Sequence, residues 1–434
     1  MRFPWNTVMH NGYKPKLSPP SWRWLLPGMG VKRYAFVASL GLLIMILAAV
    51  QVLWGQPIAS WIAHLARWSV MLGLPLWASG ILVFLIGLMV FLTGIRWMNR
   101  SMLSALTDPD QVPEQVYIHR VLEAGPKIVA LGGGSGLSRV LRGLKEETAN
   151  VTAVVAITDD GGSTGRLRLS FGIPAVGDLV DCLSALSDAE RLPELLSYRF
   201  QRGGELSGHT FGNLLLVTLY EVSGNFGQAL KDANRILSLR GAVYPASPEP
   251  ARLVSELADG RTITGETTLR DSRGQVLAIR LDPSQLPAMP EAITAIKEAE
   301  LIVLGPGSLY TSVIPSFLPD GIRAAINQAR APLVYLVNIM TEPGETDHMD
   351  AYAHYQAITL HLGRRPDVVV VNNAAIDPVV LARYWAEGQE VISFDPEPFE
   401  NEGVQVIRAD LLESGAFARH DPQKVVRAIL ELAR

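Results

Sequence analysis

The sequence has very little cysteine and, over its first quarter, no acidic residue. Cys182 is the only cysteine among 434 residues, so no disulfide can form within the chain. The same scarcity argues against a zinc site, which needs a cluster of cysteine and histidine ligands. The first acidic residue is Asp108, and nine basic residues precede it.

After Asp108 the balance of charge reverses. The remaining chain has 42 acidic residues against 29 basic ones, the 38 of the whole sequence minus the nine before Asp108, which gives −13. A nucleic-acid-binding protein carries a basic surface, so we expect no nucleic acid among the partners of this acidic body.

Two apolar runs without any charge, residues 34–54 and 70–95, occupy the acid-free part. Each is longer than the roughly 20 residues that a helix needs to cross a bilayer. We therefore predict a two-helix membrane hairpin over residues 34–97, in preference to a signal peptide or buried core helices. Basic residues flank the hairpin on both sides, which predicts a two-pass protein of the inner (cell) membrane with a basic segment 1–33 and both termini in the cytoplasm.

Residues 98–126 are expected to form a linker, and residues 127–434 a nucleotide-binding domain. Short buried-strand patterns are found in this domain at 127–131, 151–158, 301–304, 333–337 and 368–371. Helical patterns alternate with them, which predicts an α/β fold, Rossmann-like and doubly wound, with a mostly parallel sheet. Residues 250–282 alternate instead and predict a small antiparallel β insertion, with a turn at Asp259-Gly260 and a weaker one at Arg273-Gly274.

Three glycine-rich loops follow predicted strands. The first comprises Gly132, Gly133, Gly134, Ser135 and Gly136. Backbone amides at the start of a helix favour phosphate binding when no side chains shield them, as in a run of glycines. The alternative is a tight turn in which the glycines have no ligand. Leu137 occupies the sixth position, where a dinucleotide fingerprint has glycine or alanine, and no Gly-Lys-Ser/Thr follows, so the loop is neither that motif nor a Walker loop.

The second loop combines acids, glycines and arginines. Its candidate ligand-binding residues are Asp159, Asp160, Gly161, Gly162 and Arg166. The two acids suit a ribose hydroxyl, or Mg²⁺ held through water, and Arg166 suits a phosphate. A solvated loop is the alternative, since Asp and Gly readily form turns.

The third loop contains Gly305, Gly307, Ser308 and Tyr310, with Ser308 as a helix cap and Tyr310 as a stacking group. Because ligands in such sheets lie outside the carboxyl ends of the strands, the three loops are expected to share one site. His209 and Asn213, spaced i, i+4, are further candidates, or else structural residues of a helix that Ser207 or Thr210 caps.

These motifs together resemble a known family. The segments KIVALGGGSGLSRVLRGLK, VTAVVAITDDGGSTGRLR, SGHTFGNLLL, LGPGSLYTSVIP and NIMTEPGETD are similar to those of the YvcK-type gluconeogenesis factors, relatives of the 2-phospho-L-lactate transferases in the CofD superfamily. The resemblance implies binding of a UDP-N-acetylglucosamine-type nucleotide sugar, with Tyr384 and Arg419 as further contacts. It also implies self-association, expected here as a homodimer.

The resemblance leaves two functions open. The first is a regulator that binds the nucleotide sugar and influences cell shape, peptidoglycan synthesis and carbon metabolism. The alternative is a transferase that moves a phospholactyl group from a GDP-linked donor to a deazaflavin acceptor, with Mg²⁺ at Asp159 and Asp160. We favour binding and regulation and assign no catalytic residue, because kinship of fold does not carry chemistry with it.

Overall fold

The computed structural model describes residues 31–54, 76–103, 121–189 and 191–433. The chain divides into two compact units, Met1–Val116 and Tyr117–Arg434, and each is described by itself below. The predicted linker 98–126 straddles this division. Residues 104–120 of the linker and the basic segment 1–30 lie outside the described residues.

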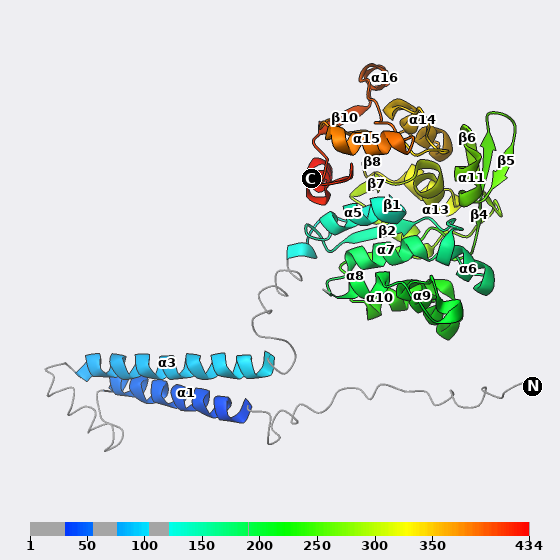
Figure 1. Ribbon diagram of the computed structural model, residues 1–434. Helices are drawn as coiled ribbons and strands as arrows, with labels where there is room; N and C mark the ends of the chain where they lie inside the picture. Colours follow the sequence, from blue (N-terminus) through cyan, green and yellow to red (C-terminus); the bar gives the residue numbers. More distant parts are fainter. Residues whose placement is uncertain (1–30, 55–75, 104–120, 190, 434) are drawn as a thin grey trace, which may run out of the picture. The chain divides into compact units, whose positions relative to one another are not determined.

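Two helices, α1 (Val31–Trp54) and α3 (Leu76–Leu103), lie side by side in the first unit (Figure 1). Glycines allow a close approach, since a Cβ added to Gly41 would lie 2.4 Å from the backbone nitrogen of Phe91. A Cβ on Gly94 would lie 2.6 Å from the nitrogen of Ala38. Such small residues are typical where helix backbones meet inside a membrane.

The outer faces of the two helices are apolar and exposed, as at Phe36, Leu43, Leu85 and Met89. Within the described residues, one helix has the length and composition to cross a membrane, through Ile81–Met98 with a mean hydropathy of 2.2. The apolar stretch Tyr34–Ala49 of α1 is shorter than a full span requires. The structure therefore supports one spanning helix by length and composition, where the sequence predicted two.

A seven-stranded sheet forms the centre of the second unit (Figure 1). Its order is β10 (Gln405–Ala409), β9 (Val368–Asn372), β8 (Leu333–Leu336), β7 (Leu301–Leu304), β1 (Ile128–Gly132), β2 (Val151–Val155) and β3 (Ala242–Pro245). Every neighbouring pair is parallel. The parallel sheet is confirmed, and the two edge strands β3 and β10 are additions to the five predicted ones.

Both faces of the sheet are covered, as the apolar strand patterns predicted. Ile128 and Ala130 face one core cluster, while Val129 and Leu131 face the other. The first face is covered by α5 (Gly134–Leu144), α7 (Gly177–Leu186), α9 (Phe211–Ser223), α10 (Phe226–Ile236) and α17 (Pro422–Leu430). The second is covered by α12 (Pro290–Glu298), η5 (Leu309–Val313), η6 (Ile314–Ser316), α13 (Asp320–Gln328) and α14 (Ala351–Leu362).

Further helices of the second unit lie outside these two sets. They are α6 (Gly162–Phe171), α8 (Leu192–Ser197), η4 (Gly204–Leu206), α15 (Pro378–Ala386), α16 (Glu397–Asn401) and η7 (Glu431–Ala433). Of these, α6 follows the second glycine loop and α15 carries a predicted ligand contact, Tyr384, so both bear directly on the candidate site.

The predicted β insertion is a three-stranded antiparallel sheet of order β5-β4-β6 (Figure 1). Its strands are β4 (Arg252–Leu257), β5 (Thr262–Thr264) and β6 (Val276–Asp282), and β4 and β5 meet at the predicted turn, where Gly260 has a φ of 86°. The second predicted hairpin turn, at Arg273-Gly274, is wrong. Helix α11 (Glu266–Ser272) lies between β5 and β6 and ends just before that dipeptide, and β6 pairs with β4 instead of β5.

Candidate functional site

The strand order reverses direction between β1 and β7. From β1 the chain continues to β2 and β3 on one side, and from β7 it continues to β8, β9 and β10 on the other. Loops leaving two such strands diverge and open a crevice, which is the usual ligand position in doubly wound sheets. A cavity of about 620 Å³ lies at this place, lined by residues 133–136 of the first glycine loop and 306–308 of the third.

These two loops touch through their backbones. A Cβ on Gly136 would lie 2.5 Å from the carbonyl oxygen of Pro306, and one on Gly307 would lie 3.2 Å from that of Gly133. Only glycine lets the two chains come so close. Gly132 is the last residue of β1, and Gly305 directly follows β7. The two glycines lie close to each other, and neither lines the cavity.

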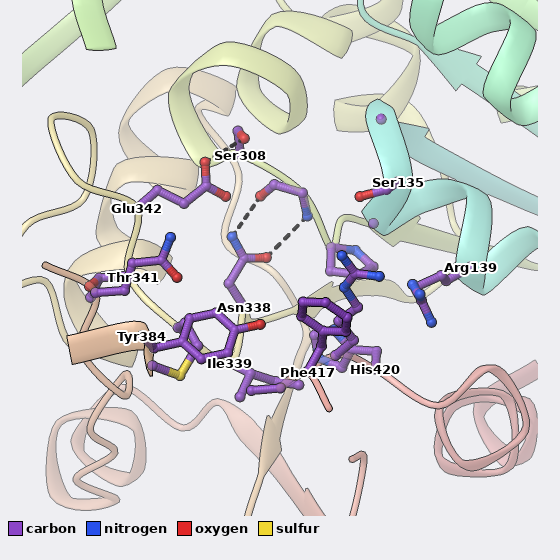
Figure 2. Close-up of a pocket in the computed structure, with 18 of the residues that line it drawn as sticks. Ser135, Arg139, Ser308, Asn338, Ile339, Thr341, Glu342, Tyr384, Phe417 and His420 are labelled. Carbon is purple, nitrogen blue, oxygen red and sulfur yellow. Dashed lines mark hydrogen bonds between the residues drawn. The ribbon is translucent and has the colours of Figure 1, made fainter. Parts of the chain in front are cut away.

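Asn338, which follows β8, fixes the third loop. Its Nδ2 donates to the carbonyl of Gly307 at 2.8 Å, and its Oδ1 accepts from the amide of Gly307 at 3.0 Å (Figure 2). A paired contact of this kind holds the loop backbone in one orientation. Asn338 was not predicted, since a single asparagine after a strand carries no distinctive sequence signal.

The cavity walls are rich in arginine. Arg139 comes from α5, Arg270 from α11, Arg383 from α15 and Arg419 from the segment after β10, whereas Glu342 and Glu387 are the only carboxylates among the lining residues that the structure describes. Four guanidinium groups against two carboxylates favour an anionic ligand. The predicted contacts Tyr384 and Arg419 both line this cavity.

Phe417 gives the cavity an aromatic surface beside Arg419. The Arg419 guanidinium carbon lies 4.3 Å from the centroid of the Phe417 ring, and that of Arg383 lies 5.8 Å from it. The ring remains 51% exposed, so it can still accept a flat partner. Phe417 was not predicted, although its position two residues before Arg419 was a usable signal.

Ser308 does not cap the following turn. Its hydroxyl donates to Glu342 Oε2 at 2.5 Å, as Figure 2 shows. Burial raises the pKa of the Glu342 carboxyl, while the bond from Ser308 opposes that rise. The cap is Glu345, whose Oε1 accepts from the amides of Tyr310 at 2.7 Å and Thr311 at 3.2 Å.

Tyr310 is not brought to the cavity. Its side chain is only 4% exposed and packs edge-on against His361 of α14, with ring centroids 6.2 Å apart. Burial raises the pKa of its hydroxyl to about 12. The predicted stacking role is therefore not met in this structure, because the η5 turn directs the ring into the core cluster on the second face of the sheet.

The second glycine loop does not line the cavity either. Asp159 Oδ1 accepts from the amide of Gly161 at 2.8 Å, and Asp160 Oδ1 accepts from the amide and hydroxyl of Thr267 on α11. Asp160 thus ties this loop, including Gly161 and Gly162 at the start of α6, to the β insertion. Among the described residues no group of three His, Cys, Asp or Glu side chains is placed to hold a metal ion.

The remaining candidates brace the second loop. Arg166 donates to the carbonyl of Ser207 at 3.1 Å. Ser163 Oγ lies 2.8 Å from His209 Nδ1 and accepts from Asn213 Nδ2 at 3.0 Å. Thr210 caps α9, in agreement with the structural alternative stated for this helix. His209 and Asn213 are both buried, so they stabilise the first turn of α6.

Asp178, at the start of α7, lies between the first and second loops. A Cβ on Gly133 would be 2.1 Å from its Oδ2, and one on Gly177 would be 3.3 Å from Oδ2 of Asp159. Loss of solvation, followed by the charges of Asp159 and Asp181, raises the pKa of Asp178 to about 7. Asp159 of the second loop therefore acts on Asp178, which lies against Gly133 of the first loop. Asp178 was not predicted.

Comparison with known proteins agrees with this geometry. A family model described as 2-phospho-L-lactate transferase CofD matches residues 128–412. The chain belongs to the CofD family. Within it, the chain belongs with the gluconeogenesis factors.

The Bacillus subtilis gluconeogenesis factor is 40% identical over 312 residues, which cover 71% of this chain and 98% of that protein. A crystal structure from Bacillus halodurans, 40% identical, covers 70% of this chain and 99% of that one with a TM-score of 0.69.

Similarity also extends into the first unit. A Deinococcus radiodurans protein that carries a gluconeogenesis-factor name is 44% identical over 418 residues, 94% of this chain and 89% of that protein. A match covering 94% of the chain must include most of Met1–Val116. Most of the N-terminal unit is therefore shared with the Deinococcus radiodurans protein, whereas the match to the Bacillus subtilis protein covers 71% of this chain.

The contact between the first and third loops can be tested by adding one methyl group. Gly136→Ala should lower the free energy of unfolding of the second unit by about 1–3 kcal/mol, because its Cβ would press on the Pro306 carbonyl. Gly161→Ala is the matched control, since its nearest neighbour is a movable Asp159 oxygen at 3.3 Å. Chemical denaturation measures both, and equal losses for the two variants would contradict the close contact.

The raised pKa of Asp178 predicts a pH-dependent effect. In the folded chain this carboxyl ionises near pH 7, against 3.8 for its ordinary value, so its ionisation costs stability as the pH rises from about 4 to 7. Asp178→Asn removes that cost. The variant should gain on the order of 2 kcal/mol more over the unsubstituted protein at pH 8 than at pH 5. Denaturation at both pH values checks this, and a gain independent of pH would refute the assignment.

Proposed function

We propose that the second unit binds a nucleotide sugar of the UDP-N-acetylglucosamine type in the cavity between β1 and β7. The proposal rests on one observation. Residues 133–136 and 306–308 meet at the switch point, and four arginine side chains line the same cavity. Bare amides at the start of α5 supply donors for a diphosphate. A cavity of about 620 Å³ falls in the range of small-molecule sites.

The groups around the glycine loops suit the two ends of such a ligand. Tyr384 and Phe417 offer aromatic surfaces for a base or a sugar face, and the Arg419 guanidinium lies over the Phe417 ring. Asn338 and Glu342 are polar residues of the same lining, as Figure 2 shows. Charge, size and aromatic surface thus favour a ligand that combines a diphosphate with a ring.

The role we propose for this binding is regulation of cell shape, peptidoglycan synthesis and carbon metabolism. The similarity to the Bacillus subtilis gluconeogenesis factor supports the link with carbon metabolism. A nucleotide sugar that serves as a cell-wall precursor would connect the two processes. We propose that the protein acts as a homodimer, in keeping with the family resemblance.

A phospholactyl transferase activity is the second candidate, because the matching family model carries that description. It would need a GDP-linked donor in the same cavity and a deazaflavin alcohol as acceptor. Asp159 and Asp160, the residues proposed to hold Mg²⁺, are engaged with Gly161 and Thr267 in this structure. Turnover of the GDP-linked donor with Mg²⁺ would favour this candidate over regulation.

Calorimetry on the full chain in detergent tests nucleotide-sugar binding. UDP-N-acetylglucosamine should bind with a 1:1 stoichiometry per chain, and Arg419→Ala should weaken it at least tenfold, since a charge-assisted hydrogen bond contributes about 1.5–3 kcal/mol. Arg408→Ala is the matched control, because Arg408 also lies over an aromatic ring, that of Phe394, away from the cavity lining. An absence of binding heat with millimolar ligand would reject the proposal.

We further propose that α1 and α3 form a two-pass hairpin in the inner (cell) membrane, with both termini cytoplasmic. The exposed apolar faces of the two helices and their glycine-mediated packing support it. The apolar stretch of α1, Tyr34–Ala49, reaches a membrane-crossing length if the uncharged residues up to Trp54 are included.

Membrane fractionation tests the hairpin. The full chain should remain with the membrane pellet after an alkaline carbonate wash. The double variant Leu85→Arg/Leu92→Arg should be released, because each arginine at the centre of a spanning helix costs about 2.5–3.5 kcal/mol. Leu85 and Leu92 are both exposed, so the body of the protein is not disturbed. Release of the unsubstituted chain by carbonate would contradict insertion.

A further inference from the structure

His420 lines the cavity beside the glycine loops, and phosphate binding gives it no role. It is held in a rigid stretch of backbone. His420 forms an isolated antiparallel bridge with Leu412. Backbone hydrogen bonds hold the residues on either side of it. The amide of Glu413 donates to the Arg419 carbonyl at 2.9 Å, and the amide of Asp421 donates to the Leu411 carbonyl at 2.8 Å. The imidazole is only 6% exposed. Its position is therefore set by the fold, not by a mobile side chain.

The two ring nitrogens of His420 differ. The ring makes a hydrogen bond with the backbone of Val337, at the end of β8, while Nε2 is buried and has no partner. Because Nε2 has no partner, we assign the bond to Val337 to Nδ1, which then carries the proton. Burial lowers the pKa of this histidine to about 4, so the ring is neutral near pH 7. Nε2 then presents a lone pair and acts as a hydrogen-bond acceptor.

An acceptor at this place is unusual, because the groups near it are donors. Arg139 faces the histidine closely enough to lower its pKa, and Arg139 is itself paired with Glu413 at 2.6 Å. The Glu342 carboxylate, another acceptor in the lining, is engaged with Ser308. Arginines and amides suit phosphate oxygens, but they cannot accept from the hydroxyl groups of a sugar.

A buried acceptor without a partner is unfavourable, and a donor that reaches it removes that cost. We propose that His420 Nε2 accepts a hydrogen bond from a sugar hydroxyl of the ligand, and so selects for hydroxylated nucleotide ligands over deoxygenated ones. The inference rests on the proposed nucleotide-sugar binding and adds a selecting residue to it. Nε2 is nearly covered, so the contact needs a small side-chain adjustment at the cavity wall, of a kind common on binding.

The hydroxyl has two sources, the ribose or the hexose, and the choice of probes separates them. UDP contains only the ribose, 2′,3′-dideoxy-UDP lacks both of its free hydroxyls, and UDP-N-acetylglucosamine adds the hexose. His420→Asn is the informative variant, because an asparagine amide can still donate to the Val337 carbonyl but has no atom at the Nε2 position. His420→Gln places an amide oxygen near that position and should restore part of the affinity.

Calorimetry of the full chain with these probes gives the expected results. If the ribose is read, His420→Asn should weaken UDP and UDP-N-acetylglucosamine by roughly fivefold to tenfold while leaving 2′,3′-dideoxy-UDP unchanged. If the hexose is read, only UDP-N-acetylglucosamine should weaken. A purely structural role would reduce the affinity for all three ligands equally, which is why the comparison of probes is decisive.

Three results overturn the inference. They are equal loss for every probe, no loss for any probe in a folded His420→Asn variant, and a His420→Gln variant that binds no better than His420→Asn. Failure of the proposed function would look different, since the unsubstituted protein would then bind neither UDP nor UDP-N-acetylglucosamine. In that case the inference falls together with the function on which it rests.

Discussion

The candidate site depends on the contact between two glycine-rich backbones at the ends of β1 and β7. Because Gly136 and Gly307 lack side chains, the Pro306 and Gly133 carbonyls can approach them, and the loops meet instead of being held apart. The strand order places these two ends next to each other at the switch point, so the contact follows from topology as well as from composition. Asn338 then fixes the third loop with two hydrogen bonds.

The other walls of the cavity come from elements around this contact. The segment after β10 and helix α15 bring arginines and aromatic rings to one side of the opening, and α11 of the β insertion brings Arg270 from another. Asp178 lies between Asp159 of the second loop and Gly133 of the first loop, and neither acid lines the cavity. The second loop therefore shapes the first loop and couples the insertion to it, through the bond between Asp160 and Thr267.

Much of the fold could be predicted from the sequence, because buried parallel strands are continuous apolar runs that stand out. The edge strands could not, since Ala242–Pro245 ends in a proline and Gln405–Ala409 mixes polar with apolar residues. The structure brings the first and third glycine loops together at one cavity, as their positions after predicted strands led us to expect. Tyr310 was misplaced because a turn of backbone decides which way a ring points, and Phe417, Asn338 and His420 meet the cavity only through long-range packing.

The most direct test of the central claim is a crystal structure of the full chain or its second unit with UDP-N-acetylglucosamine bound. We expect the diphosphate between the amides of residues 133–136 and the loop 306–308, with a ring of the ligand near Tyr384 and Phe417. Density for the diphosphate elsewhere would contradict the claim, for example at the second loop beside Asp159. So would density in the separate cavity at the opposite end of β1, beside Lys127 and Glu291.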